Sequence, residues 1–191
     1  ISRGLVGSEM CIRDSNGIGM NEEDLKSSLG TIARSGTKAF LEQISKSNKD
    51  KKTDMSMIGQ FGVGFYASFM VADDVEVISK KAGDSQAWKW SSDGKTGFNL
   101  VKADKNNFGT SILLKLKKDA KEFLEETRLQ FIVRKYSDHI SYPVKLSQKD
   151  KKDTEIKTLN EASALWTRPA KEIKDEQYQE FFSHIGAGFG K

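Results

Sequence analysis

Three glycine-containing elements, separated by long stretches of other sequence, constrain this chain of 191 residues more than any other feature. "NGIGM" occupies 16–20, "GQFGVGF" occupies 59–65, and "GT" stands at 109–110. Glycine lets a backbone approach a ligand closely and adopt positive φ angles, and free amides at a helix N-terminus bind anions. Each turn is therefore either a site of close helix packing or the rim of a phosphate site.

The second element reads G-x-x-G-x-G and comes directly before an apolar stretch. It is not a dinucleotide fingerprint, which is G-x-G-x-x-G after a strand. It is not a P-loop either, because no Gly-Lys-Ser/Thr follows. On this element alone, helix packing and phosphate binding stay open at about even odds.

Local patterns predict a domain that mixes helices with an antiparallel sheet. Asn21 begins an acidic helix that Gly30 can end, and Thr37 can begin a second helix. The turn "SSDGKTG" predicts a hairpin, and apolar spacing over 129–140 predicts an amphipathic helix. "YPVKL" predicts a last short strand, and Asp175 is a plausible cap for a helix beyond it. Alternation predicts strands over 75–77, 88–90, 98–100 and 112–116.

Composition excludes several classes of protein. The formal net charge is +4 and Cys11 is the single cysteine, so no internal disulfide can form. The two histidines stand far apart in sequence and predict no zinc cluster. The apolar stretch over 61–72 is too short to span a bilayer. The lysine clusters at 49–52 and 149–152 interleave Asp and lack aromatic residues, so nucleic-acid binding is not expected.

The order D-x-G-x-G, G-x-x-G-x-G and G-T resembles the GHKL ATPases, which share the Bergerat nucleotide-binding fold. The runs "LGTIARSGTKAFLE", "MIGQFGVGFYASFMVADDVEVISK" and "ALWTR" look like the heat-shock protein 90 chaperones of the bacterial high-temperature-protein-G type. The resemblance implies an α+β, two-layer α/β sandwich with a mixed, mostly antiparallel sheet, helices on one face, and the family's first strand and helices missing. It also implies ATP or ADP as ligand, with Mg²⁺ in the intact parent.

The resemblance further implies a nucleotide site. Ser15 stands where the family has an Asp that accepts a hydrogen bond from the adenine amino group, and Ser28 replaces a frequent Asn. Arg34 would neutralise phosphate charge on a lid that closes over ATP. Without the family, Met20, Leu29 and Phe65 would be core residues. The implied set is Ser15, Gly17, Gly19, Met20, Ser28, Leu29, Arg34, Ser35, Gly36, Gly59, Gln60, Phe61, Gly62, Val63, Gly64, Phe65 and Thr110.

The family's catalytic pattern, E-x-x-x-N-A-x-D, is missing from this sequence. Glu9 is the only carboxylate before Asp14, and Arg13 stands four places after Glu9. We therefore expect no catalytic Glu, no metal-binding residue, and little or no ATPase activity. The segment 1–15 resembles translated adapter sequence and is interpreted as foreign.

The remaining expectations concern organisation and partners. We expect a partial ATP-binding domain over 16–148, a charged linker over 149–160 and the start of a middle domain over 161–191. The parent would be a cytoplasmic homodimer that binds unfolded or partly folded clients, with no nucleic acid or membrane partner. The fragment would be monomeric or aggregation-prone. Two alternatives remain: a non-catalytic nucleotide-binding or interaction module, and another GHKL ATPase such as a histidine kinase or topoisomerase subunit.

Overall fold

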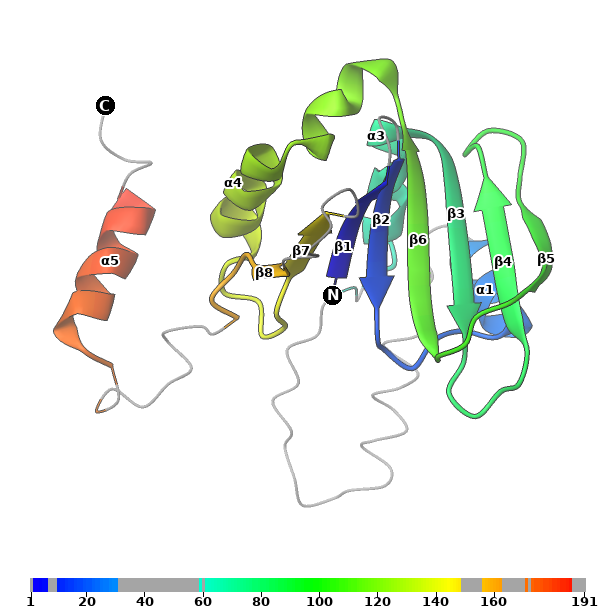
Figure 1. Cartoon of the computed structure of the whole chain (residues 1–191), viewed down its shortest axis with the longest axis horizontal. Helices are drawn as coiled ribbons and strands as arrows, with labels where there is room; N and C mark the ends of the chain where they lie inside the picture. The colour runs from blue at the N-terminus through cyan, green and yellow to red at the C-terminus, as the bar shows by residue number, and fades with distance from the viewer. Residues whose placement is uncertain are drawn as a thin grey trace.

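An eight-stranded sheet, in the order β5-β4-β3-β6-β2-β1-β7-β8, forms the centre of the described chain (Figure 1). The structure is a computed structural model that describes residues 2–6, 10–30, 59, 61–148, 156–162, 171 and 173–186. The strands are β1 (Ser2–Val6), β2 (Met10–Ser15), β3 (Ala72–Lys80), β4 (Ala87–Ser92), β5 (Asn99–Ala103), β6 (Gly109–Leu116), β7 (Lys145–Gln148) and β8 (Lys157–Thr158).

Six helical segments accompany the sheet in the part of the chain that the structure describes. They are α1 (Glu22–Leu29), the 3-10 helix η1 (Gly64–Ala67), α3 (Ser68–Val71), the 3-10 helix η2 (Lys118–Leu124), α4 (Glu126–Ser137) and α5 (Asp175–Gly186). Among the described strands, β1 and β7 pair in parallel and all other pairs are antiparallel. The expectation of a mixed, mostly antiparallel sheet is confirmed.

The strand register places the helices on one face of the sheet. Residues in one register row share a face. One row crosses the sheet through Trp90, Val77, Ile112, Arg13, Arg3 and Leu146. Leu25 of α1 packs against Val77 and Trp90 at one end of this row, and Leu129 of α4 packs in a cluster with Leu146 at the other end. Both helices therefore lie on the same face, as expected.

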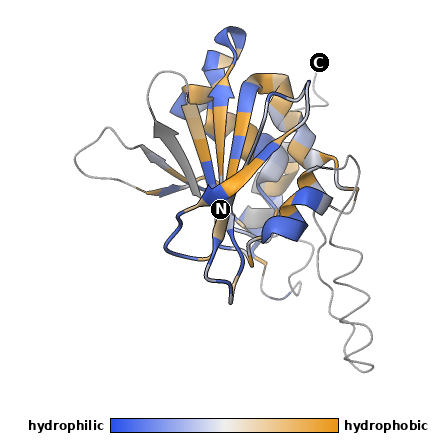
Figure 2. Ribbon diagram, turned by 90° about the vertical axis from the view of Figure 1, so that its right-hand side faces the viewer, coloured by the Kyte–Doolittle hydropathy of each residue, from blue (hydrophilic) through white to orange (hydrophobic). Residues whose placement is uncertain are grey.

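Local sequence signals set the bounds of several elements. Asn21 and Asp24 form a capping box at the start of α1, and the Gly30 N–H donates to the Lys26 carbonyl at its end. The turn over 93–98 joins β4 and β5 into the expected hairpin. The helix expected over 129–140 spans Glu126–Ser137, and Ile140 packs beyond its end. In Figure 2 apolar residues lie on both the strands and the helices, and the turns that join the strands are largely hydrophilic.

Two segments at the ends of the expected ATP-binding domain join its sheet. Residues 2–6 and 10–15, within the segment interpreted as foreign, form β1 and β2. β8 pairs with β7, and the next two residues, Leu159 and Asn160, are buried. The Asn160 side chain accepts from Val144 N–H at 2.8 Å and donates to the Tyr142 carbonyl at 3.0 Å. The end of the 149–160 segment therefore packs against β7 and the loop before it.

Some expected features fall outside the described residues. These are the helix after Thr37, both lysine clusters, and the site residues Arg34, Ser35, Gly36 and Gln60. Among the described helices, none has the length and apolar character needed to cross a membrane.

Candidate nucleotide site

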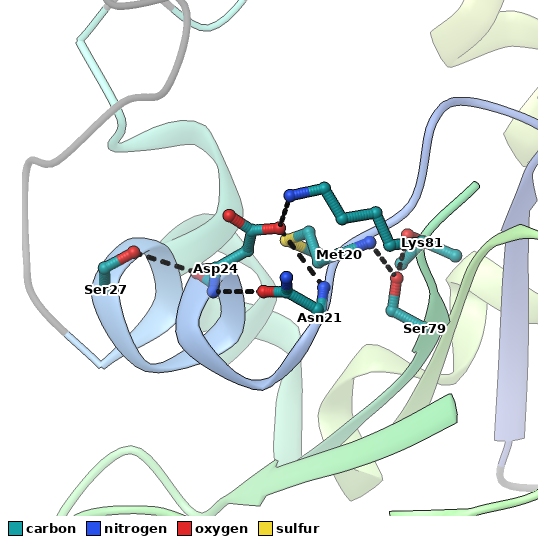
Figure 3. Close-up of polar contacts among 7 residues, drawn as sticks. Met20, Asn21, Asp24, Ser27, Ser79 and Lys81 are labelled. Carbon is teal, nitrogen blue, oxygen red and sulfur yellow. Dashed lines mark hydrogen bonds and ion pairs between the residues drawn. The ribbon is translucent and has the colours of Figure 1, made fainter. Parts of the chain in front are cut away.

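The turn at 17–20 is docked against the end of β3 (Figure 3). Gly19 has φ +74°, and a Cβ built on it would lie 1.9 Å from the Lys80 carbonyl oxygen. Ala82 N–H donates to the Ile18 carbonyl at 2.7 Å. Met20 N–H donates to Ser79 Oγ at 2.8 Å. Only glycine fits at position 19, because any other residue would adopt an unfavourable positive φ and its Cβ would overlap the Lys80 carbonyl.

Three hydroxyl residues form a register row beside this turn. Ser15 of β2 pairs with Thr110 of β6, and Thr110 pairs with Ser79 of β3. This row lies two residues further along the strands than the row through Val77, so it shares the helix-covered face. Ser79 is fully buried, and its Oγ lies 2.8 Å from Thr110 Oγ1 and 3.2 Å from the Gly109 carbonyl oxygen.

The register also places Asp14 and Ser15 on opposite faces of the sheet. Asp14 pairs with Ser111, one place out of step with the hydroxyl row, so it belongs to the opposite face of the sheet. Ser15 belongs to the face of the site, and its Oγ accepts a hydrogen bond from Gly17 N–H at 3.1 Å. A hydroxyl therefore occupies the position at which the resemblance implies a carboxylate.

Helix α1 is fastened to the same region by an ion pair. Lys81 Nζ lies 2.8 Å from Asp24 Oδ2, and Asp24 is also part of the capping box (Figure 3). The hydrogen bond to Asp24 raises the pKa of Lys81 above its ordinary value of 10.5, and the partial burial of Lys81 opposes this rise. The contact joins the first turn of α1 to the segment that follows β3.

The second glycine element presents an open turn. Gly59 and Gly62 have φ values of +91° and +64°, and the Gly62 N–H donates to the Gly59 carbonyl at 3.2 Å. Phe61 and Val63 are exposed, and a Cβ on Gly64 would meet nothing within 4 Å. The helix that follows is short, with η1 and α3 four residues each, so its dipole adds little to anion binding.

Phe65 and Leu29 both pack against the core cluster on the site face. The Phe65 ring lies edge-on to Trp90, with ring centroids 5.5 Å apart. Tyr66 donates its hydroxyl to the Leu29 carbonyl at 3.2 Å. A cavity of about 320 Å³ borders Leu29, Tyr66 and Trp90. Met20 packs against the same cluster, so residues from the first and second glycine elements share one core.

The potential metal ligands that the structure brings together lie elsewhere. Among the described residues, one group of three offers ligand atoms within 4.8 Å of one another: Asp138, His139 and Glu161. They stand beyond the end of α4 and beside β8, not in the hydroxyl row. None of these three residues belongs to the set that the resemblance implies for the nucleotide.

Comparison with known proteins decides the family. Residues 3–110 match the family model described as "Histidine kinase-, DNA gyrase B-, and HSP90-like ATPase". The chain belongs to this family. The fold of this ATPase family accounts for the sheet and for the helices on one face.

Curated relatives of this ATPase domain carry the name "Chaperone protein HtpG". The relative from Rhodospirillum rubrum is 53% identical over 174 residues, which cover 91% of this chain and 27% of the relative. The relative from Roseobacter denitrificans is 53% identical over 176 residues, covering 92% of this chain and 27% of the relative. The relative from Gluconobacter oxydans is 50% identical over 182 residues, which cover 95% of this chain and 29% of the relative. The chain therefore spans less than a third of the length of these relatives.

Sequence reasoning missed two residues that contact the region around the 17–20 turn, Ser79 and Lys81. Ser79 continues the alternation of Val75 and Val77, and all three are fully buried. The sequence signal was a serine at a strand position where the alternation predicts a buried apolar residue. A hydroxyl buried at such a position needs hydrogen-bond partners. Lys81 gave no such signal, since its partner Asp24 stands 57 residues away.

Proposed function

We propose that this chain binds an adenine nucleotide on the helix-covered face, beside the hydroxyl row of Ser15, Thr110 and Ser79. The observation that carries the proposal is the docking of the Gly19 turn onto β3 next to this row. The edge of adenine presents N–H donors and ring-nitrogen acceptors. Hydroxyl groups can donate and accept, so the residues present fit that edge. Membership of an ATPase family supports the same ligand.

The remaining residues of the proposed site surround the purine and the phosphates. Met20 and Leu29 would contact the base, and Phe65 would support it from the core. The open turn at 59–64 would direct backbone amides at the phosphates. Ser28, Gly17 and the lid residues Arg34, Ser35 and Gly36 would complete the site, with Gln60, Phe61 and Val63 in the phosphate turn.

We further propose that the whole protein is an ATP-dependent molecular chaperone. The support is the name shared by relatives about 50% identical over most of this chain. The whole protein would bind unfolded or partly folded client proteins, act as a homodimer in the cytoplasm, and use Mg²⁺ with ATP. A histidine kinase or gyrase subunit is less favoured, because these relatives are named chaperones.

The domain division remains part of the proposal. We propose an ATP-binding domain over 16–148, a linker within 149–160 and the start of a middle domain over 161–191. We also propose that residues 1–15 are foreign to the gene, although residues 2–6 and 10–15 form strands. Sequencing the native locus tests this point, and finding these fifteen codons in frame in genomic DNA would refute it.

Titration with ADP by isothermal calorimetry tests the nucleotide site. We expect weak, saturable binding by the chain, and tighter binding by Ser15→Asp. A carboxylate is an acceptor-only group, and one well-made hydrogen bond to a charged partner contributes about 1.5–3 kcal/mol, which corresponds to roughly 10- to 150-fold in affinity.

Asp14→Asn is the matched control for this titration. It changes a neighbouring acid on the opposite face of the same strand, so ADP affinity should not change. Absence of saturable ADP binding in both the parent chain and Ser15→Asp would overturn the proposed function.

A further inference from the structure

Ser79 lies at the point where the first and third glycine elements meet. Its Oγ accepts from Met20 N–H at 2.8 Å, lies 2.8 Å from Thr110 Oγ1, and lies 3.2 Å from the Gly109 carbonyl oxygen. Its side chain is fully buried, so water does not supply alternative partners. All hydrogen-bonding capacity of this hydroxyl must therefore be met by these three groups.

Counting donors and acceptors fixes the direction of each hydrogen bond. A serine hydroxyl has one proton to donate and two lone pairs. Met20 N–H can only donate, and the Gly109 carbonyl can only accept. All three contacts are satisfied together when Ser79 donates to Gly109 and accepts from both Met20 and Thr110. If Ser79 instead donates to Thr110, its bond to Gly109 is lost and one of its lone pairs is unused.

The preferred arrangement has a consequence for Thr110. Its single hydroxyl proton points at Ser79, so only its lone pairs remain for a ligand or a bridging water. We propose that Ser79 is a positioning residue that makes Thr110 a hydrogen-bond acceptor and so selects purines bearing a 6-amino group over purines bearing a 6-oxo group. This inference rests on the proposed nucleotide site.

The selection follows from the chemistry of the two bases. Adenine carries an amino group at position 6, which donates hydrogen bonds, whereas hypoxanthine carries an oxygen there, which accepts them. A Thr110 lone pair in direct contact with the base accepts from the amino group and has no proton to offer the oxygen. Ser15 cannot provide the same selection, because its exposed hydroxyl can turn to donate or to accept. Thr110 is therefore the polar group of the row whose donor or acceptor character is set by a buried partner.

The test is the ratio of ADP affinity to IDP affinity, measured by calorimetry. We expect the parent chain to prefer ADP, and Ser79→Ala to reduce this preference by about fivefold, the effect of one ordinary hydrogen bond. The released Thr110 hydroxyl could then donate to the 6-oxo group. Ser79→Thr keeps a hydroxyl and should keep the preference. Thr110→Val removes the hydroxyl and should lower the preference as much as Ser79→Ala does.

One control variant and one replacement variant separate this role from a general structural one. Ser111→Ala changes the neighbouring residue of β6, which faces the other side of the sheet and accepts from Lys105 Nζ, and it should leave the ratio unchanged. If Ser79→Ala does not fold, Ser79→Cys is measured in its place, because the thiol fills similar space and forms only weak hydrogen bonds. Ser15→Asp is used only in a separate ADP titration, because its acceptor-only carboxylate would itself favour a 6-amino group and obscure the ratio.

The outcomes distinguish this inference from the proposed function. A folded Ser79→Ala or Ser79→Cys chain that binds ADP and IDP in the parental ratio would overturn the positioning role and leave nucleotide binding intact. Tighter binding of IDP than of ADP by the unmutated chain would also overturn the positioning role. No binding of either nucleotide, with or without Ser15→Asp, would overturn the proposed function itself. An equal loss of both affinities in Ser79→Ala would show a structural role only, and would overturn the selection.

Discussion

Lys81 Nζ lies 2.8 Å from Asp24 Oδ2, and this pair joins the first turn of α1 to the chain that leaves β3. The lysine side chain is 34% exposed and that of the aspartate 38% exposed, so solvent screens the pair. The contact lies beside the docked turn at 17–20 (Figure 3), where it supports the rim of the proposed site.

The ion pair predicts a small loss of stability at alkaline pH. The pKa of Lys81 is raised in the folded chain above 10.5. The stabilisation is therefore fully present below the pKa of Lys81 in the unfolded chain and is lost as pH rises through the folded value. Its size should stay below about 1 kcal/mol. Urea unfolding of the parent and of Lys81→Met, measured across this alkaline range, should show the two stabilities converging. A constant difference between the two chains would contradict the assignment.

The close approach of Gly19 to Lys80 predicts a large penalty for any side chain at position 19. Gly19→Ala combines a positive φ, which costs about 1–2 kcal/mol, with a steric overlap that costs about 1–3 kcal/mol more. Urea unfolding at neutral pH measures the sum. Gly83→Ala is the matched control, because Gly83 has φ +90° but nothing within 4 Å of an added Cβ. Equal losses in both variants would show that the overlap relaxes without cost.

Asn160, at the end of the segment interpreted as a linker, should stabilise the folded chain through its hydrogen bonds. Its amide group bonds to Val144 N–H and to the Ser137 and Tyr142 carbonyls. Asn160→Ala should lower the free energy of unfolding by about 2–3 kcal/mol, because buried backbone groups lose their partners. Asn107→Ala, at an exposed position, should change stability by less than about 0.5 kcal/mol. A similar small effect at both positions would mean that water replaces the Asn160 amide.

Catalysis gives a fourth prediction. We expect little or no phosphate release from MgATP by this chain. The family places a water-activating Glu and a metal-binding Asn before the first glycine turn, and here Arg13 follows four places after Glu9. A phosphate-release assay with increasing chain concentration measures the rate. Turnover that copurifies with the chain through two chromatographic steps and scales with its concentration would contradict the expectation.

Local signals predicted those parts of the fold that depend on residues near one another. Asn21 and Gly30 marked both ends of α1, and alternation marked β3, β4, β5 and β6, because capping and strand patterning act within one element. The expectation of helices on one face of the sheet followed from the family resemblance. By contrast, the segment over 149–160 looks uniformly charged, and nothing local showed that Leu159 and Asn160 are buried.

The hydroxyl row could not be predicted, because it depends on register between strands far apart in sequence. Ser15, Ser79 and Thr110 come from β2, β3 and β6, and a shift of one residue would move any of them to the other face. The same register placed Asp14 on the face opposite to Ser15. Sequence reasoning placed Ser15 at the expected acid position by its distance from "GIGM", and this assignment stays a prediction.

The parallel pairing of β1 with β7 has a consequence for the order of folding. Ser2 pairs with Lys145, so strands β2 to β6 all lie between the two partners in the sequence. The hairpin of β4 and β5 closes a short loop and can form early, whereas the β1–β7 pair must close a very long one. During synthesis, residues 2–6 must wait until 145–148 have emerged before they can find this partner. The β8 end of the finished sheet, where β1 and β7 pair, should therefore be among the last parts to assemble.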